Sequence, residues 1–385
     1  MIKLLHREDC CGCGACAATC PHGAIRMEAD GMGFRYPVVD RTLCVDCGLC
    51  EKTCAFKPAH TPAVARAEVL RFPALLENSQ SGGLATAVMN KALKAGYIVY
   101  GAAQEADFRV RHRRVDSPEG LEPLRLSKYA QSDMEGIPQQ VLQDLKAGRK
   151  VLFTGTPCQC AGIGSLCEKY RDHLLLADIL CHGVPAPAVW KSYVEWEEKR
   201  KGKKLTAALS RDPAWPGNVL HTRLEFGPEK VLTRDYMFLF LKNLILRPSC
   251  FQCPFSSLHR PSDITMADAW GVEMVLPGFA DDGKGCSMLL CATEAGTAFT
   301  TSFADACVRQ PVPLEKMMQA PLERPARKHL FADSFEKTYL RSGFRRAQAR
   351  FGAQSVPGVI ERWIPRLNPF NTKLYRRLKK KLSCE

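Results

Sequence analysis

The sequence predicts an α/β protein (α+β overall), with a small cysteine-rich domain followed by a larger α/β domain. Three observations lead to this prediction. Nine of the 19 cysteines lie between Cys10 and Cys54. Beyond them, short apolar segments alternate with helical periodicity, which is typical of a partly parallel sheet. The 385 residues, 46% of them apolar, exceed the usual size of one domain and suffice for a substantial core.

The first domain is predicted to span residues 1–57, with strand-like pieces at residues 2–5, 25–27 and 34–38. Between these pieces the spacing CxxCxxCxxxC occurs twice. The two copies are Cys10, Cys13, Cys16 and Cys20, followed by Pro21, and Cys44, Cys47, Cys50 and Cys54. This internal repeat resembles bacterial two-cluster ferredoxin domains over their whole length.

Three cysteines separated by two residues each on a tight turn can bind three corners of a [4Fe-4S] cluster, while the fourth points along a helix toward the second cluster. The pairing is therefore expected to cross between the two copies. One cluster would use Cys10, Cys13, Cys16 and Cys54, and the other Cys44, Cys47, Cys50 and Cys20. Zinc is the competing interpretation, but zinc sites are usually built from paired CxxC knuckles. Cys11 falls outside the pattern and is predicted to be a bystander.

A proline-containing linker is predicted at residues 58–72, and the main domain at residues 73–330, with an N-terminal part (about 73–160) and a C-terminal part (about 161–330). Apolar periodicity and terminating glycines predict helices at residues 83–95, 138–147, 187–200 and 236–246. Runs of β-branched and apolar residues predict strands at residues 97–102, 151–154, 174–180, 219–226, 264–267 and 288–292.

Three further groups of cysteines lie where apolar strands or helices end, next to Gly or Pro, where side chains can face a crevice. They belong to the motifs GTPCQC (155–160), CHG (181–183) and RPSCFQCP (247–254). A single cysteine at the end of a strand is usually a small buried apolar residue. The convergence of three such groups favours a shared metal site instead.

These motifs, taken with SGG (81–83), SKY (127–129) and RPSDIT (260–265), resemble the coenzyme F420 hydrogenase/dehydrogenase beta subunit family in content and in order. The resemblance covers roughly residues 1–330. It implies a flavin-binding α/β domain in which FAD exchanges electrons with iron–sulfur clusters and with a hydride donor or acceptor. It also implies a third [4Fe-4S] cluster on Cys158, Cys181, Cys250 and Cys253, with Cys160 as a rival to Cys158.

The same resemblance implies the residues around the flavin. Ser81, Gly82 and Gly83 open a helix whose N-terminus suits the FAD pyrophosphate, although an ordinary capped helix explains them too. The remaining expected contacts are Lys128, Tyr129, Gly155, Thr156 and Pro157. His182 is expected to be a proton donor or a neighbour of the cluster.

The function expected is that of an iron–sulfur flavoprotein oxidoreductase. It would pass electrons between a ferredoxin-like carrier, three [4Fe-4S] clusters and FAD, with hydride chemistry on a deazaflavin-like or other small substrate. The alternative is an electron-delivery subunit that serves a partner enzyme and has no substrate of its own.

The charge of +14 is concentrated at the C-terminus, where residues 344–385 contain eleven Lys and Arg against two Glu. Residues 331–385 are predicted to be a basic helical tail, which could contact a membrane surface or an acidic partner. Nucleic acid is not expected as a partner, because no aromatic residues are interleaved with a basic surface. With no apolar leader before Cys10 and many cysteines, the protein is expected in the cytoplasm, where thiols stay reduced.

Overall fold

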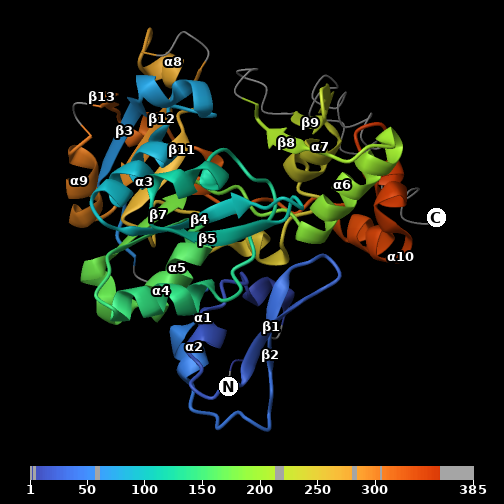
Figure 1. Cartoon of the computed structure of the whole chain (residues 1–385), viewed down its shortest axis with the longest axis horizontal. Coiled ribbons are helices and arrows are strands. Elements are labelled where there is room, and N and C mark those ends of the chain that lie inside the picture. The colour runs from blue at the N-terminus through green and yellow to red at the C-terminus, as the bar shows by residue number, and fades with distance from the viewer. Residues whose placement is uncertain are drawn as a thin grey trace.

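An eight-stranded mixed sheet forms the centre of the larger domain in the computed structural model (Figure 1). The structure describes residues 2, 6–56, 61–212, 221–279, 284–303 and 306–355. The strand order is β13-β3-β12-β11-β7-β6-β4-β5. The strands are β3 (Arg66–Arg71), β4 (Ile98–Gln104), β5 (Val110–Val115), β6 (Val151–Gly155), β7 (Leu174–Ile179), β11 (Ile264–Asp268), β12 (Ser287–Cys291) and β13 (Val308–Pro311).

The four central strands β4, β6, β7 and β11 run parallel, and their outer neighbours pair antiparallel. The carboxyl ends of the parallel strands therefore meet at one edge of the sheet, where ligands of open α/β sheets usually bind. Successive side chains of β4 point to opposite faces of the sheet and contribute to the apolar core on each face. Val99 packs toward α3 (Leu84–Lys94), whereas Ile98 packs toward α4 (Ile137–Lys146) and α5 (Pro157–Leu166).

Shorter helical segments and one further helix cover the ends and the rim of this sheet. They are η2 (Pro73–Asn78), η3 (Pro118–Leu124), η4 (Glu168–His173), α8 (Val272–Val275), α9 (Glu294–Thr301), η6 (Leu314–Lys316) and η7 (Ala320–Leu322). No helix among the described residues is both long and apolar enough to cross a membrane.

A second sheet, antiparallel and three-stranded, lies beside the main sheet with the order β10-β9-β8 (Figure 1). Together with three helices and a 3-10 turn it encloses a separate apolar core rich in aromatic residues. These elements are β8 (Ala207–Ser210), β9 (Thr222–Phe226), β10 (Glu229–Thr233), α6 (Pro187–Lys201), α7 (Asp235–Leu241), η5 (Pro248–Gln252) and α10 (Ala332–Phe351).

The N-terminal unit lies against the side of the main domain that carries α4 and α5 (Figure 1). It consists of a two-stranded antiparallel hairpin and short helical turns. Its elements are η1 (Arg7–Asp9), α1 (Ala15–Ala18), β1 (Ile25–Ala29), β2 (Arg35–Val39) and α2 (Leu49–Thr53).

Most predicted helices and strands are present with small shifts at their ends. The predicted helix at residues 236–246 is shorter, because α7 stops at Leu241. The segments 2–5 and 219–226 lie partly outside the described residues. The structure also contains α5 at Pro157–Leu166, where the sequence predicts no helix but a turn after the strand at residues 151–154.

Two predicted boundaries differ from the structure. The linker predicted at residues 58–72 contains β3, which pairs with both β12 and β13 inside the main sheet. The predicted tail at residues 331–385 begins with α10, whose Phe335, Phe344 and Phe351 are buried in the core beside the second sheet. The rest of that tail, from residue 356, lies outside the described residues. The two predicted parts of the main domain both contribute strands to a single sheet.

Candidate functional site

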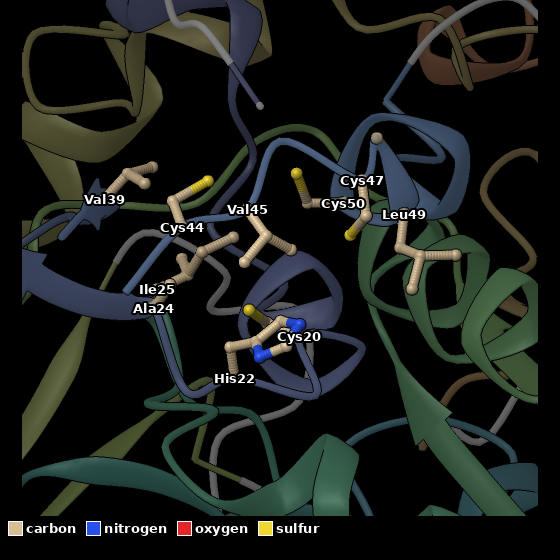
Figure 2. A pocket seen from close by; sticks show the side chains of 11 residues that line it. Cys20, His22, Ala24, Ile25, Val39, Cys44, Val45, Cys47, Leu49 and Cys50 are labelled. Carbon is tan, nitrogen blue, oxygen red and sulfur yellow. The ribbon is translucent and has the colours of Figure 1, made fainter. Parts of the chain in front are cut away.

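Four cysteines line one pocket within the N-terminal unit, which we call the outer site (Figure 2). Cys20 comes from the first copy of the motif, and the other three come from the second, so the set is crossed in the way the spacing predicts. Apolar side chains from β1, β2 and the loop before α2 complete the wall. The four cysteines are Cys20, Cys44, Cys47 and Cys50.

A second crossed set, the inner site, gathers Cys10, Cys13, Cys16 and Cys54. Burial raises the pKa of the Cys16 thiol, and the nearby thiols of Cys13, Cys10 and Cys54 raise it further. Burial likewise raises the pKa of Cys10 to about 11, against the opposing effect of the Arg247 charge. Because these four thiols shift one another's pKa values, they must lie close together. They come from α1, from the end of α2 and from the loop before α1.

Cys11, predicted as a bystander, lies fully buried between the inner site and the main domain. Its thiol is hydrogen-bonded to the sulfurs of both Cys13 and Cys158, and these bonds are the largest cause of its raised pKa. The hydrogen bond from Cys11 is also the main reason that the pKa of Cys158 falls to about 7. One side chain therefore touches a cysteine of the inner site and a cysteine of the main domain.

A third set of four cysteines comes from three separate elements of the main domain, and we call it the main-domain site. Cys158 lies in the first turn of α5, Cys181 follows β7, and Cys250 and Cys253 lie in and after η5. Burial raises the pKa of Cys181, and the next three causes are Cys250, Cys158 and Cys253. Burial raises the pKa of Cys250 to about 12, with Cys158 and Cys253 again contributing.

Backbone pairing explains why these distant segments meet. Residues 184–186 run antiparallel to residues 245–247, with hydrogen bonds from the Arg247 amide to the Val184 carbonyl (3.0 Å) and from the Ala186 amide to the Ile245 carbonyl (2.9 Å). The Val184 amide donates to the sulfur of Cys250 at 3.4 Å. The CHG and RPSC motifs are thus neighbours in space.

The structure distinguishes the two cysteines of the GTPCQC motif. The sulfur of Cys158 lies 3.2 Å from the hydroxyl of Thr156 and close to Cys11. Cys160, on the same helix, is fully buried in the core between α5 and the sheet, near Ser262 and Asp178. Cys158 therefore groups with the other three cysteines, and Cys160 belongs to the core.

The donor sets fit iron–sulfur chemistry. Among the described residues, no three His, Cys, Asp or Glu side chains converge closely enough for a single metal ion. Each of the three sites instead offers four thiols, which is the number of ligands that a [4Fe-4S] cluster takes.

The residues expected to open the flavin site are packed tightly against the sheet. A Cβ on Gly82 would lie 2.4 Å from the Leu70 carbonyl oxygen and 2.5 Å from the Ser287 amide, so glycine is required by the protein itself. The Ser81 hydroxyl donates to the Cys286 carbonyl at 2.7 Å. Gly83, with φ of 87°, caps α3.

Unsatisfied polar groups lie beside this turn. Lys128 is half-buried, desolvation lowers its pKa to about 7, and its ammonium donates to the Arg125 carbonyl at 2.6 Å. Among the described residues it forms no ion pair. The Nε of Arg125 and the hydroxyl of Ser79 are buried without a hydrogen-bond partner, and Arg125 donates to the Asn78 carbonyl at 3.0 Å. No sequence motif singles out Ser79 or Arg125 as candidate site residues.

The other expected flavin contacts lie at the carboxyl edge of the parallel strands. Thr156 precedes α5, and its amide donates to the side chain of Gln159 at 3.0 Å. Pro157 begins the helix directly after Gly155, the last residue of β6. Burial raises the pKa of Tyr129, while the nearby Arg211 opposes that rise. Arg211, a further residue that the sequence analysis missed, pairs with Asp268 at 2.7 Å, at the end of β11.

His182 is exposed and bonded through Nε2 to the side chain of Asn243 at 2.6 Å. Its ring contacts Phe240, with centroids 5.6 Å apart, and Phe240 also contacts Tyr129, with centroids 5.0 Å apart. His182 and Tyr129 therefore share one aromatic neighbour.

Comparison with known proteins agrees with the motifs. Residues 148–315 match the family described as the C terminus of the coenzyme F420 hydrogenase/dehydrogenase beta subunit, and residues 9–57 match the 4Fe-4S dicluster domain. No curated protein matches the chain. Among solved structures, a xenon-derivatised F420-reducing [NiFe] hydrogenase complex from Methanosarcina barkeri is similar. It has 16% identity and a TM-score of 0.47, over 75% of this chain and 91% of that chain. The chain therefore combines a 4Fe-4S dicluster domain at its N-terminus with a C-terminal domain of the coenzyme F420 hydrogenase/dehydrogenase beta subunit type.

Proposed function

We propose that this protein is an iron–sulfur flavoprotein oxidoreductase. It carries electrons between a one-electron carrier protein and FAD through three [4Fe-4S] clusters, and performs hydride chemistry on a deazaflavin-like or other small molecule. The outer, inner and main-domain sites would each hold one cluster. Iron–sulfur clusters transfer single electrons, whereas a flavin can take up electrons singly and pass them on as a hydride.

The observation that carries this proposal is the continuity of the three thiol sets. The outer and inner sites share α1 and α2, since each takes cysteines from both copies of the motif. Cys11 then joins the inner site to the main-domain site through Cys13 and Cys158. Cys47 of the outer site is exposed, so a carrier protein can approach there.

Lys128, Arg125 and Ser79 support a flavin near the turn before α3. An anionic pyrophosphate would supply partners for the desolvated Lys128 ammonium and for two unsatisfied polar atoms. Tyr129, Thr156 and His182 lie toward the main-domain site, where the reactive end of the cofactor would be placed. There His182 would act as the proton donor, since its exposed ring is open to solvent.

All 18 cysteines within the described residues are free thiols, which supports a reducing compartment such as the cytoplasm. The same reducing conditions keep cysteine ligands available for cluster assembly.

The test is anaerobic measurement of iron and flavin in the purified protein. We expect about twelve iron atoms and about one FAD per chain. Cys158→Ala should lose about four irons, whereas the matched control Cys160→Ala on the same helix should lose none. Equal iron in the Cys158→Ala variant and the native protein would contradict the third cluster. Iron without flavin would favour the alternative, an electron-delivery subunit that serves a partner enzyme and has no substrate of its own.

A further inference from the structure

Arg247 is a buried arginine held between the N-terminal unit and the main domain. Its exposed fraction is 1%. The guanidinium donates three hydrogen bonds, from Nε to the Cys10 carbonyl at 2.8 Å, from Nη1 to the Gln131 side chain at 2.9 Å and from Nη2 to the Arg35 carbonyl at 2.8 Å. It also lies over the ring of Tyr36, 4.4 Å from the centroid. The side chain is therefore fixed in place.

No carboxylate compensates this charge among the residues that the structure describes. All three hydrogen-bond acceptors of Arg247 are neutral. Arg260, which is equally buried, differs in this respect because it pairs with Asp178 at 2.7 Å. A buried cation without an anionic partner is costly, so an arginine that remains buried needs another source of negative charge.

The inner and main-domain sites can provide that charge. Arg247 donates to the backbone of Cys10, an inner-site cysteine, and lies three residues before Cys250, a main-domain cysteine. A Cβ on Gly12, between the inner-site cysteines Cys10 and Cys13, would lie 2.8 Å from Nη1. The guanidinium also lies within electrostatic range of the Cys10 and Cys250 thiols, and the Cys250 amide donates to the Arg247 carbonyl at 2.9 Å. One cation thus acts on both thiol sets.

We propose that Arg247 is the shared counter-ion of the inner and main-domain clusters and raises the reduction potential of both relative to the outer cluster. This inference rests on the proposed function. A [4Fe-4S] cluster on four thiolates is an anion, and reduction by one electron adds one negative charge without breaking a bond or moving a proton. A nearby cation stabilises the reduced form more than the oxidised form. Electrons that enter at the outer site are consequently drawn inward.

The test is an anaerobic redox titration of the full-length protein followed by electron paramagnetic resonance. Arg247→Met removes the charge at similar length, and Arg247→Lys keeps the charge but loses the planar fork. The titration should show three one-electron reduction steps (waves), one for each cluster. In Arg247→Met we expect the waves of the inner and main-domain clusters to move to lower potential. At a fixed potential the ratio of reduced to oxidised cluster should fall at least tenfold, which is 59 mV for one electron. The third wave, from the outer site, should stay in place, and Arg247→Lys should keep all three near the native values.

A second variant keeps the proposal testable if Arg247→Met does not fold. Gln131→Glu is nearly isosteric and places a carboxylate 2.9 Å from the guanidinium, so it should lower the same two waves while Arg247 remains. Twelve irons with three unshifted waves in Arg247→Met or Gln131→Glu would overturn the counter-ion role of Arg247 but leave the three-cluster proposal intact. An equal shift in Arg247→Lys and Arg247→Met would also overturn it, because position rather than charge would then matter. Eight irons and two waves in the native protein would overturn the third cluster, and the shared role with it.

Discussion

Lys128 is the residue whose chemistry is most sensitive to its surroundings. Desolvation lowers its pKa to about 7, so its ammonium is mostly charged at pH 6 and mostly neutral at pH 9. Binding of an FAD phosphate would require the charged form. FAD binding should therefore take up a proton above pH 7, and the dissociation constant should rise by up to about tenfold per pH unit.

Flavin fluorescence titrations of the deflavinated protein between pH 6 and pH 9 measure this dependence. Lys128→Met should bind FAD more weakly at pH 6 and should lose the slope. Lys94→Met, an exposed lysine at the end of α3, should keep it. A native slope in Lys128→Met would show that this ammonium does not contact the cofactor.

At the scale of elements, the contact between α1 and α5 joins the N-terminal unit to the main domain. A Cβ on Gly162 in α5 would lie 2.6 Å from the sulfur of Cys13 and 2.8 Å from its Cβ. Neither helix can move away freely, because Ala15 at the start of α1 is buried and Gly162 lies on a helix packed against β6 and β7. The absence of a side chain at Gly162 is therefore a condition for the inner site.

Gly162→Ala should displace Cys13 and lower the iron content by about four atoms, the content of one [4Fe-4S] cluster. Gly164→Ala on the same helix is the matched control, since its nearest neighbour is the flexible end of Leu176 at 3.1 Å. Iron analysis of both variants decides the matter. Full iron in Gly162→Ala would mean that α1 can shift without loss of the site.

Elements whose residues contact distant parts of the chain were the ones that sequence patterns missed. In β3, Glu68 is buried and pairs with Arg66 and Arg309, so a charged residue occupies a position that a pattern assigns to the surface. In α5, Gly162 and Gly164 disfavour a helix locally, yet tertiary packing stabilises one. Patterns of apolar residues predicted the remaining central strands because those strands are buried on both faces.

In the candidate site, too, local patterns predicted some features, whereas others depend on contacts between distant parts of the chain. The doubled cysteine spacing predicted the crossed sets, because spacing fixes which thiols can meet on a turn. The role of Cys11 and the choice between Cys158 and Cys160 depend on how α5 faces the N-terminal unit, which no local pattern contains. Arg247 stands in the RPSC motif, and its position just before Cys250 was the available signal.

At the scale of the whole molecule, the main domain completes the inner site. Gln131 donates to the Cys11 carbonyl at 2.9 Å, Arg247 donates to the Cys10 carbonyl, and α5 packs on Cys13. The outer site needs none of these contacts, since the residues that line it all belong to the N-terminal unit.

Residues 1–56 produced alone should therefore retain the outer cluster and lose the inner one in air. Iron per chain should fall toward about four atoms during exposure, while the intact protein keeps the inner cluster longer. Anaerobic purification followed by timed exposure measures the difference. Loss of both clusters at equal rates in the fragment and the intact protein would contradict a protective role for the main domain.

The position of β3 in the sheet has a consequence for the order in which the protein folds during synthesis. β3 follows the N-terminal unit in the sequence, but within the described residues its partner strands are β12 and β13, which leave the ribosome much later. Chains fold from the N-terminus during synthesis. The cysteine motifs would therefore be accessible to iron and sulfide before β3 has a partner strand, and the wall containing Gln131 and Arg247 would form afterwards. Cluster insertion into the N-terminal unit can therefore precede the packing of the main domain against it.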